Sequence, residues 1–255
     1  MYFSDIIFGP VQSRRLGVSL GINLLPLHGK WCNFDCIYCE CGWNREGLAD
    51  KQLPSRADVC GALEARLQML AAGKKLPDAI TFSGNGEPTI HPEFAGIVDD
   101  VVALRNRFAP TARVCALSNA TTLMREEVFA ALQKTDCPIL KLDAAVTSTA
   151  KRMNNPVGDY TVEQVVAAMQ RFHHNFILQT MFLRGDCQGS FIDNTTPEEV
   201  TRWLEVVALL RPREVMIYTI DRETPVQGLR KIPLHELEQI AVKVRQMGVP
   251  VRVSG

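Results

Sequence analysis

Three cysteines near the N-terminus have a spacing suited to metal binding. Cys32, Cys36 and Cys39 follow one another as CxxxCxxC. Thiolates are soft ligands that select zinc, copper(I) or iron–sulfur clusters. A structural zinc site normally closes with four ligands; Cys41 offers a fourth, but CxxxCxxCxC is not a usual zinc spacing. Three thiolates on a cubane iron–sulfur cluster would leave one iron open for a small molecule, as catalysis requires.

A second candidate is the glycine-rich segment Ser83-Gly84-Asn85-Gly86-Glu87-Pro88. Its glycines permit a tight turn and a close approach of the backbone to a ligand. Glu87 offers a carboxylate that could bind an ammonium group. By itself the segment would be interpreted as an ordinary turn after a strand, so its meaning depends on its position beside the cysteines.

Both segments follow strand-like stretches in a regular alternation of expected strands and helices. The expected strands are 19–25, 79–82, 114–117, 139–142, 176–183 and 215–220, and the expected helices are 55–72, 92–108, 125–134, 161–172, 197–210 and 234–246. Strands separated by helices pair in parallel with right-handed crossovers. We therefore predict an α/β fold, a partial (β/α)6 TIM-type barrel with parallel strands; an open doubly wound sheet is the alternative.

The prediction treats residues 1–255 as one domain, with an N-terminal arm (1–18), six βα units (19–247) and a C-terminal tail (248–255). In such folds ligands gather at the carboxyl ends of the strands. Lys141 and Asp143 share one strand face there, which suggests a site or a buried ion pair. Other polar residues at these ends are Ser118, Asn119, Gln179, Thr180, Tyr218 and Thr219.

Composition narrows the class of protein. Lysine plus arginine equals aspartate plus glutamate, 28 against 28, which weakens a general nucleic-acid-binding interpretation. No stretch approaches the run of about 20 apolar residues that spans a bilayer, and the N-terminus lacks a signal-peptide pattern. We expect a cytoplasmic protein with no membrane partner. In that compartment eight cysteines indicate a metal or redox site more than disulfides.

The motifs resemble those of the radical S-adenosylmethionine (SAM) superfamily. Its signature is CxxxCxxC with an aromatic residue just before the third cysteine, a place that Tyr38 fills. Its GGEP motif is matched at Gly86, Glu87 and Pro88, whereas Asn85 replaces the first glycine. Asparagine tolerates left-handed backbone geometry, so we expect the loop to keep its form. The resemblance implies a [4Fe–4S] cluster on the three cysteines, with S-adenosyl-L-methionine bound to the open iron.

The resemblance also implies the reaction. One electron, from a flavodoxin- or ferredoxin-type donor, would cleave SAM to a 5′-deoxyadenosyl radical that abstracts hydrogen from a substrate. We expect the cysteines, Lys141 and Asp143 to be catalytic, with Asp143 on a ribose hydroxyl and Lys141 toward the substrate. The expected cofactor-binding residues are Tyr38, Gly84, Asn85, Gly86, Glu87, Ser118, Asn119, Asp143, Gln179, Thr180 and Tyr218.

Further segments are similar to the wyosine-synthase-like group of Fe–S oxidoreductases, namely 8–17, 19–23, 82–88 and 218–222. This slightly favours an RNA or nucleoside substrate. However, no cysteine precedes Cys32 to hold the second cluster of true wyosine synthases, and Arg14 and Arg15 form a small basic patch at best. A protein or peptide substrate, a small metabolite, and a non-enzymatic zinc protein stay open, as does a second-cluster or hydrogen-donor role for Cys41 or Cys187.

Overall fold

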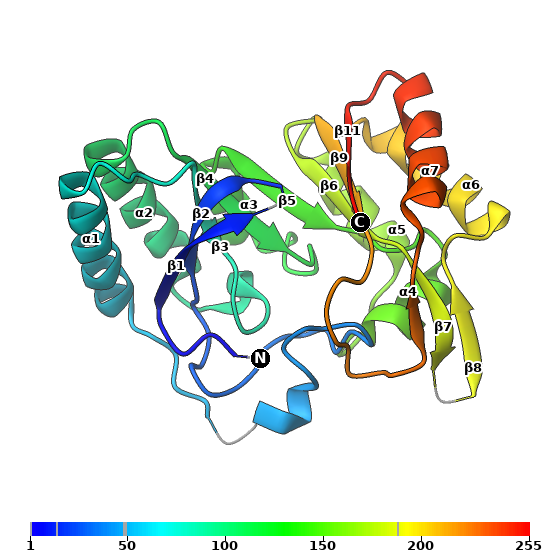
Figure 1. Ribbon diagram of the computed structural model, residues 1–255, viewed down its shortest axis with the longest axis horizontal. Coiled ribbons are helices and arrows are strands. Elements are labelled where there is room, and N and C mark those ends of the chain that lie inside the picture. The colour runs from blue at the N-terminus through cyan, green and yellow to red at the C-terminus, as the bar shows by residue number, and fades with distance from the viewer. Residues whose placement is uncertain (1, 14, 48–49, 188) are drawn as a thin grey trace. The chain divides into compact units, whose positions relative to one another are not determined.

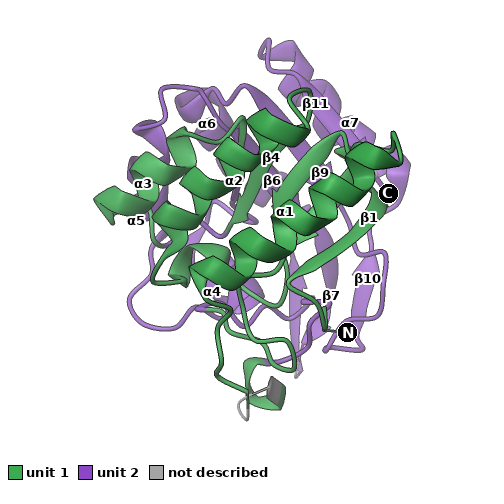
Figure 2. Ribbon diagram, turned by 90° about the vertical axis from the view of Figure 1, so that its left-hand side faces the viewer, with its two compact units in different colours: residues 1–32, 44–118, 122–138 green, residues 33–43, 119–121, 139–255 purple. Residues whose placement is uncertain are grey.

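The computed structural model describes residues 2–13, 15–47, 50–187 and 189–255 (Figure 1). Arg14 of the predicted basic patch therefore lies outside the described residues. The chain forms two compact units (Figure 2). Unit 1 comprises residues 1–32, 44–118 and 122–138, and unit 2 comprises residues 33–43, 119–121 and 139–255.

Unit 1 is built on four neighbouring strands in the order β1-β2-β3-β4. They are β1 (Ile7–Ser13), β2 (Gly17–Ile22), β3 (Ala79–Phe82) and β4 (Arg113–Ser118). The β1 strand runs antiparallel to β2, and β2, β3 and β4 run parallel. All four residues of β3 are buried, as expected for a parallel strand covered on both faces.

The described part of unit 1 also contains three helices (Figure 2) and two short 3-10 turns. The helices are α1 (Arg56–Ala72), α2 (Phe94–Phe108) and α3 (Glu126–Gln133), and the turns are η1 (Asn44–Gly47) and η2 (Pro88–Ile90). Ser55 begins α1 with a capping box to Asp58, which satisfies backbone N–H groups that the first turn leaves unpaired. Helix α1 packs on α2, and α2 packs on α3.

Unit 2 contains the parallel order β5-β6-β9-β11. Its strands are β6 (Ile177–Met181), β9 (Glu214–Tyr218), β11 (Val251–Ser254) and the end of β5 (Cys137–Lys141), whose first two residues belong to unit 1. A separate antiparallel sheet has the order β10-β7-β8. Its strands are β7 (Leu183–Cys187), β8 (Ser190–Asp193) and β10 (Leu229–Lys231).

Four helices belong to unit 2. They are α4 (Thr147–Asn154), α5 (Val162–Gln170), α6 (Pro197–Leu210) and α7 (Leu234–Gln246). Helix α6 begins after the capping Thr196 and buries Trp203 against the unit. None of the helices in the described ranges is long and apolar enough to cross a membrane.

The six predicted βα units are present, and β3, α6 and α7 have their predicted bounds. The stretch expected as an N-terminal arm contains β1, and the expected C-terminal tail contains β11. Helix α4 and the sheet β10-β7-β8 were not predicted. The sequence of α4, TSTAKRMN, has too few apolar residues to give a helical periodicity, and it is held by tertiary contacts instead.

Candidate functional site

The second and third cysteines of the motif lie on one tight turn of unit 2. The Cys39 N–H donates to the Cys36 carbonyl at 3.1 Å, and the Gly42 N–H donates to the Cys39 carbonyl at 2.9 Å. Cys36 is buried and Cys39 is partly exposed. The turn therefore presents two neighbouring thiols, one sheltered from water and one at the surface of the unit.

A buried hydrogen-bond network surrounds this turn. The Tyr38 hydroxyl donates to Oδ2 of Asp143, and the Asn154 amide donates to the same oxygen at 2.7 Å. The other carboxylate oxygen accepts the Met181 N–H at 2.9 Å and lies 3.2 Å from the Lys141 ammonium. Asp143 is 2% exposed. Both oxygens of this predicted site residue are thus bound within the unit.

Lys141 links this network to the end of β9. Its ammonium donates to the Tyr218 hydroxyl at 2.8 Å. It also lies 4.9 Å from the centre of the Tyr38 ring and 5.3 Å from that of Tyr218, within the range of cation–π attraction. Four residues predicted from the sequence, Tyr38, Lys141, Asp143 and Tyr218, are therefore brought together in unit 2.

Burial controls the electrostatics of this cluster. It raises the pKa of the Cys36 thiol to about 11, and the nearby Lys141 charge opposes that rise. Burial, followed by the Asp143 charge, raises the pKa of Tyr38 well above its usual value. Burial alone would lower the pKa of Lys141, but the charge of Asp143, the nearby Tyr218 and Cys36 and the hydrogen bond to Tyr218 together raise it. Lys141, whose side chain is 15% exposed, therefore keeps its positive charge.

The glycine-rich loop lies in unit 1, joined to the residue before Cys32. The Trp31 N–H donates to the Asn85 carbonyl at 2.9 Å, and the Glu87 N–H donates to the Trp31 carbonyl at 3.2 Å. Gly86 has a φ of +140°, and a Cβ there would lie 2.0 Å from the Trp31 oxygen. Gly86 permits this close pairing, which positions the loop against the start of the cysteine motif.

Asn85 keeps the loop in place for a reason other than the predicted one. The sequence suggested that Asn85 replaces glycine because it tolerates left-handed backbone geometry. Asn85 does not adopt that geometry, since its φ is not positive. Its fully buried amide instead donates to the carbonyls of Phe3 at 2.9 Å and Pro26 at 2.8 Å, and its oxygen accepts the Phe3 N–H at 2.8 Å. The asparagine ties the loop to the N-terminal segment, which a glycine could not do.

Glu87 is buried, with 3% of its surface exposed. Its Oε1 accepts the Thr89 N–H at 3.2 Å and the Thr89 hydroxyl at 2.5 Å. The Thr89 hydroxyl also lies 2.5 Å from that of Thr122. These contacts fix the orientation of the predicted ammonium-binding carboxylate.

The remaining predicted residues are buried at or near strand ends. Ser118 and Gln179 are 4% and 5% exposed. Asn119 donates to the Asn33 side chain at 2.7 Å, and its oxygen accepts the Thr121 hydroxyl at 2.7 Å. Thr180 donates to the Leu142 carbonyl at 2.7 Å and accepts the Trp203 indole N–H at 3.0 Å. For Thr180 these contacts describe a packing role.

Asn154 is the residue in the cluster that sequence reasoning missed. It ends α4, a helix without a sequence signal, and its partner Asp143 is 11 positions away. Among the described residues, no group of three or more cysteine, histidine or acidic side chains is gathered closely enough to hold a metal ion. Cys32 belongs to unit 1, whereas Cys36 and Cys39 belong to unit 2. The assignment of the three cysteines to one metal site therefore depends on their CxxxCxxC spacing in the sequence.

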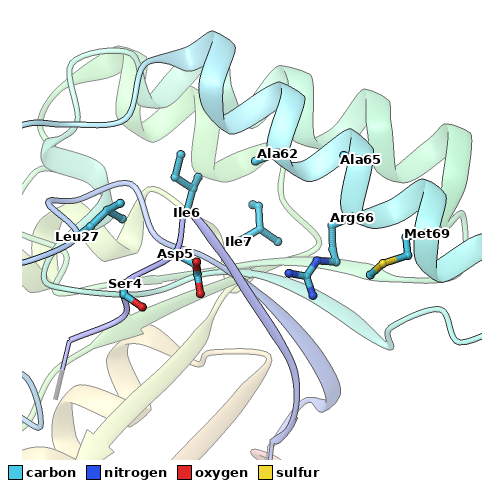
Figure 3. A pocket seen from close by; sticks show the side chains of 9 residues that line it. All are labelled: Ser4, Asp5, Ile6, Ile7, Leu27, Ala62, Ala65, Arg66 and Met69. Carbon is cyan, nitrogen blue, oxygen red and sulfur yellow. The ribbon is translucent and has the colours of Figure 1, made fainter.

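A cavity of about 520 Å³ lies elsewhere, within unit 1 (Figure 3). It is lined by residues 4–7 and Leu27 on one side and by Ala62, Ala65, Arg66 and Met69 of α1 on the other. Arg66 is engaged with the Gly9 carbonyl at 2.9 Å. None of the predicted site residues lines this cavity.

Sequence comparison with known proteins identifies a family. Residues 27–187 match the Radical SAM superfamily. A UPF0026 protein of Synechocystis is 31% identical over 227 residues, which cover 87% of this chain and 77% of that protein. A Brachyspira hyodysenteriae protein named GTPase Obg is 28% identical over 91% of this chain, which spans only 32% of that protein.

Solved structures show the same fold at low sequence identity. A radical SAM methyltransferase from Sphaerobacter thermophilus has a TM-score of 0.68 and 12% identity, covering 92% of this chain and 65% of its own. Streptococcus suis SuiB bound to S-adenosylmethionine has a TM-score of 0.66 and 14% identity, covering 92% and 50%. Archaeal TYW1 has a TM-score of 0.54 and 11% identity, covering 89% and 71%.

These likenesses confirm the predicted partial TIM-type barrel with parallel strands. The family match covers the cysteine motif, the glycine-rich loop and the Lys141–Asp143 strand end. Radical SAM enzymes use a [4Fe–4S] cluster and S-adenosylmethionine, as the sequence motifs implied. On this evidence the chain belongs to the radical SAM superfamily and is an enzyme.

Proposed function

We propose that Cys32, Cys36 and Cys39 hold the [4Fe–4S] cluster of this enzyme and that the loop Gly84–Pro88 helps to bind SAM. The observation that carries the proposal is the buried network of Tyr38, Asp143 and Asn154 around Cys36. Such a network holds the loop of the motif in one conformation before any cofactor arrives, which lowers the entropy cost of binding.

The donor chemistry of the chain fits the cluster. Thiolates are the ligands of [4Fe–4S] clusters, and a thiol that coordinates a metal loses its proton to the surroundings. Burial disfavours the thiolate form of Cys36 and raises its pKa to about 11. A bound iron would supply the positive charge that stabilises this buried thiolate. The Lys141 ammonium already lies close enough to act on the same sulfur.

The loop chemistry fits SAM. Gly84 and Gly86 have φ values of +149° and +140°, and a Cβ on either would collide with Asn23 or Trp31. The two glycines thus allow Asn23 and Trp31 to pack directly against the loop, which fixes its course. Glu87 supplies a fixed carboxylate for the methionine amino group.

When bound, the cluster and SAM supply a one-electron reductive cleavage that generates a hydrogen-abstracting radical. The protein's own residues would bind these two groups and orient them. Tyr38 and Asp143 hold the cysteine turn, and Lys141 places a partly buried positive charge beside it. Because both oxygens of Asp143 are bound internally, we propose that it positions Tyr38 rather than holding the predicted ribose hydroxyl.

For the substrate we propose RNA or a nucleoside, and a flavodoxin- or ferredoxin-type donor for the electron. The support for RNA is the resemblance of segments 8–17, 82–88 and 218–222 to the wyosine-synthase-like group. The fold does not discriminate, because SuiB, a structural neighbour with 14% identity, has been solved with a precursor peptide.

The test is anaerobic reconstitution with iron and sulfide, followed by SAM and a reductant, with 5′-deoxyadenosine measured by chromatography. We expect 5′-deoxyadenosine from the wild type and at least about a hundredfold less from Cys36→Ala. The three cysteines would act as one ligand set, so the loss of one removes the function of all three. Cys60→Ala, on the partly exposed surface of α1, is the matched control. Cleavage retained by Cys36→Ala would contradict the ligand assignment.

Parallel reactions with a small-RNA pool and with a protein extract address the substrate. Stimulation of 5′-deoxyadenosine formation by RNA supports the substrate proposal, whereas stimulation by the protein extract alone overturns it. Colourless protein with stoichiometric zinc would instead support the non-enzymatic alternative.

A further inference from the structure

The Asn154 side chain contacts the sulfur of a proposed cluster ligand directly. Its side-chain amide lies 3.4 Å from the Cys36 sulfur, within hydrogen-bond range for sulfur, and 2.8 Å from the Tyr38 hydroxyl. The same nitrogen lies 2.7 Å from Oδ2 of Asp143. The residue is 1% exposed, so water does not compete for these bonds. The amide has two hydrogens for these three acceptors, so the Cys36 sulfur shares an N–H with a neighbouring oxygen.

The backbone fixes this placement independently of the side chain. The Asp35 N–H donates to the Asn154 carbonyl at 2.9 Å, and the Ile37 N–H donates to the Met153 carbonyl at 3.0 Å. The Val157 N–H donates to the Asn33 carbonyl at 2.8 Å. The end of α4 is thus bonded along the cysteine loop on both sides of Asn154. Replacing its side chain leaves these three backbone bonds available.

The other two contacts of Asn154 do not by themselves require an amide. The Tyr38 hydroxyl already has Asp143 as its acceptor, and Asp143 also receives the Met181 N–H and the Lys141 charge. For the sulfur of Cys36, by contrast, Asn154 is the hydrogen-bond donor among the residues that the structure describes. The contact specific to Asn154 is its hydrogen bond to sulfur.

We propose that Asn154 is a positioning residue that hydrogen-bonds the Cys36 sulfur of the bound cluster and raises the cluster's reduction potential. Reduction adds one electron without making or breaking a bond, and the added charge is spread onto the ligand sulfurs. An N–H directed at such a sulfur stabilises the reduced form more than the oxidised one, and hydrogen bonds to sulfur are a recognised determinant of cluster potential. The inference rests on the proposed ligation by Cys36.

The test is a redox titration of the reconstituted protein, followed by electron paramagnetic resonance of the reduced cluster. Asn154→Leu removes both N–H groups at similar size, and Asn154→Ala removes them without adding bulk. At a fixed solution potential, we expect the ratio of reduced to oxidised cluster to fall about tenfold in both variants. A change of this size is expected for the loss of one hydrogen bond to a charged group. For one electron it corresponds to a decrease of about 59 mV in the reduction potential.

Asn155→Gly is the matched control. Asn155 is the next residue, is exposed and has a φ of +41°, a geometry that glycine accepts. We expect the reduction potential of the cluster in Asn155→Gly to equal that in the wild type. Iron and sulfide contents and the thermal unfolding midpoint are measured on every sample, because a purely structural role would change those quantities and not the potential.

A wild-type potential in Asn154→Ala at full cluster content overturns the inference. So does failure of both Asn154 variants to assemble the cluster while their unfolding midpoints stay normal, since Asn154 would then serve assembly and not potential. Failure of the proposed function is distinguishable: it is visible as a wild-type protein without a cluster, or as a Cys36→Ala variant that keeps the wild-type cluster and its activity.

Discussion

At the scale of single residues, the chemistry of this chain depends on side chains whose partners are fixed by burial. Glu87, Asp143 and Asn154 are each buried and each hydrogen-bonded within their own unit. The sequence identified Glu87 and Asp143 because carboxylates after buried strands are conspicuous. It did not identify Asn154, since an asparagine in an NNP turn has no chemical signature until its neighbours in space are known.

Gly86→Ala should destabilise the protein and weaken SAM binding. The substitution adds a Cβ 2.0 Å from the Trp31 oxygen at a φ of +140°. Backbone strain of this kind costs about 1–3 kcal/mol, and relief of the collision would displace Trp31 from the loop. Urea unfolding and a SAM-binding titration check the expectation.

Gly61→Ala is the control for that experiment. Gly61 lies in α1, and a Cβ there meets nothing within 4 Å. Because alanine is the better helix former, a gain of about 0.5–1 kcal/mol is expected. Equal effects of the two substitutions would show that the loop tolerates a side chain.

His91 should make the stability of the protein fall in mild acid. It is 1% exposed, its Nδ1 accepts the Glu93 N–H at 3.1 Å, and its Nε2 therefore carries the proton that meets the Pro54 carbonyl at 3.0 Å. Burial lowers its pKa below the ordinary value of 6.5. As pH falls below about 6.5, the unfolded state binds a proton that the folded state refuses, so the free energy of unfolding decreases.

Urea unfolding between pH 7.5 and pH 5 measures this effect. The pH dependence should be smaller in His91→Gln than in the wild type, whereas His235→Gln, an exposed position at the start of α7, should leave it unchanged. A wild-type pH dependence in His91→Gln would mean that His91 titrates equally in both states.

At the scale of elements, periodicity decided what could be predicted. Helices α6 and α7 have regular apolar faces and clear starts, and their predicted bounds agree with the structure. Strand β1 and helix α4 lack such patterns, since their stability comes from neighbours: β1 pairs with β2, and α4 is bonded to the cysteine loop. Local sequence does not encode those partners.

Thr180 belongs to this scale because it joins β6 to α6. Thr180→Val would leave the Leu142 carbonyl and the Trp203 indole N–H buried without their partner. Stranding buried polar groups costs about 1–3 kcal/mol each. We expect a loss of stability of that order in urea unfolding, with an unchanged Kd for SAM.

Thr201→Val, on the exposed face of α6, is the matched substitution and should change stability by less than about 0.5 kcal/mol. A large increase in the Kd for SAM at normal stability in Thr180→Val would support the role in the SAM pocket that the sequence predicted for this residue.

At the scale of the whole molecule, the alternation of strands and helices restricted the fold to a TIM-type barrel or an open doubly wound sheet, because parallel βα units have few arrangements. The solved radical SAM structures share that fold at 11–14% identity. The antiparallel sheet β10-β7-β8 is not part of the repeating βα units, so the alternation of strands and helices does not predict it. Substrate choice is similarly outside what the shared fold determines.

The long sequence separation between Cys36 and its buried partner has a consequence for biosynthesis. Asn154 follows Cys36 by 118 residues. At about 5–20 residues per second, a ribosome needs about 6–24 s to synthesise that interval. Throughout that time the nascent chain carries its cysteine motif without the helix end that later shields it. The Cys36 thiol, which is buried in the finished protein, is thus open to solvent, oxidants and iron while the chain is still being made.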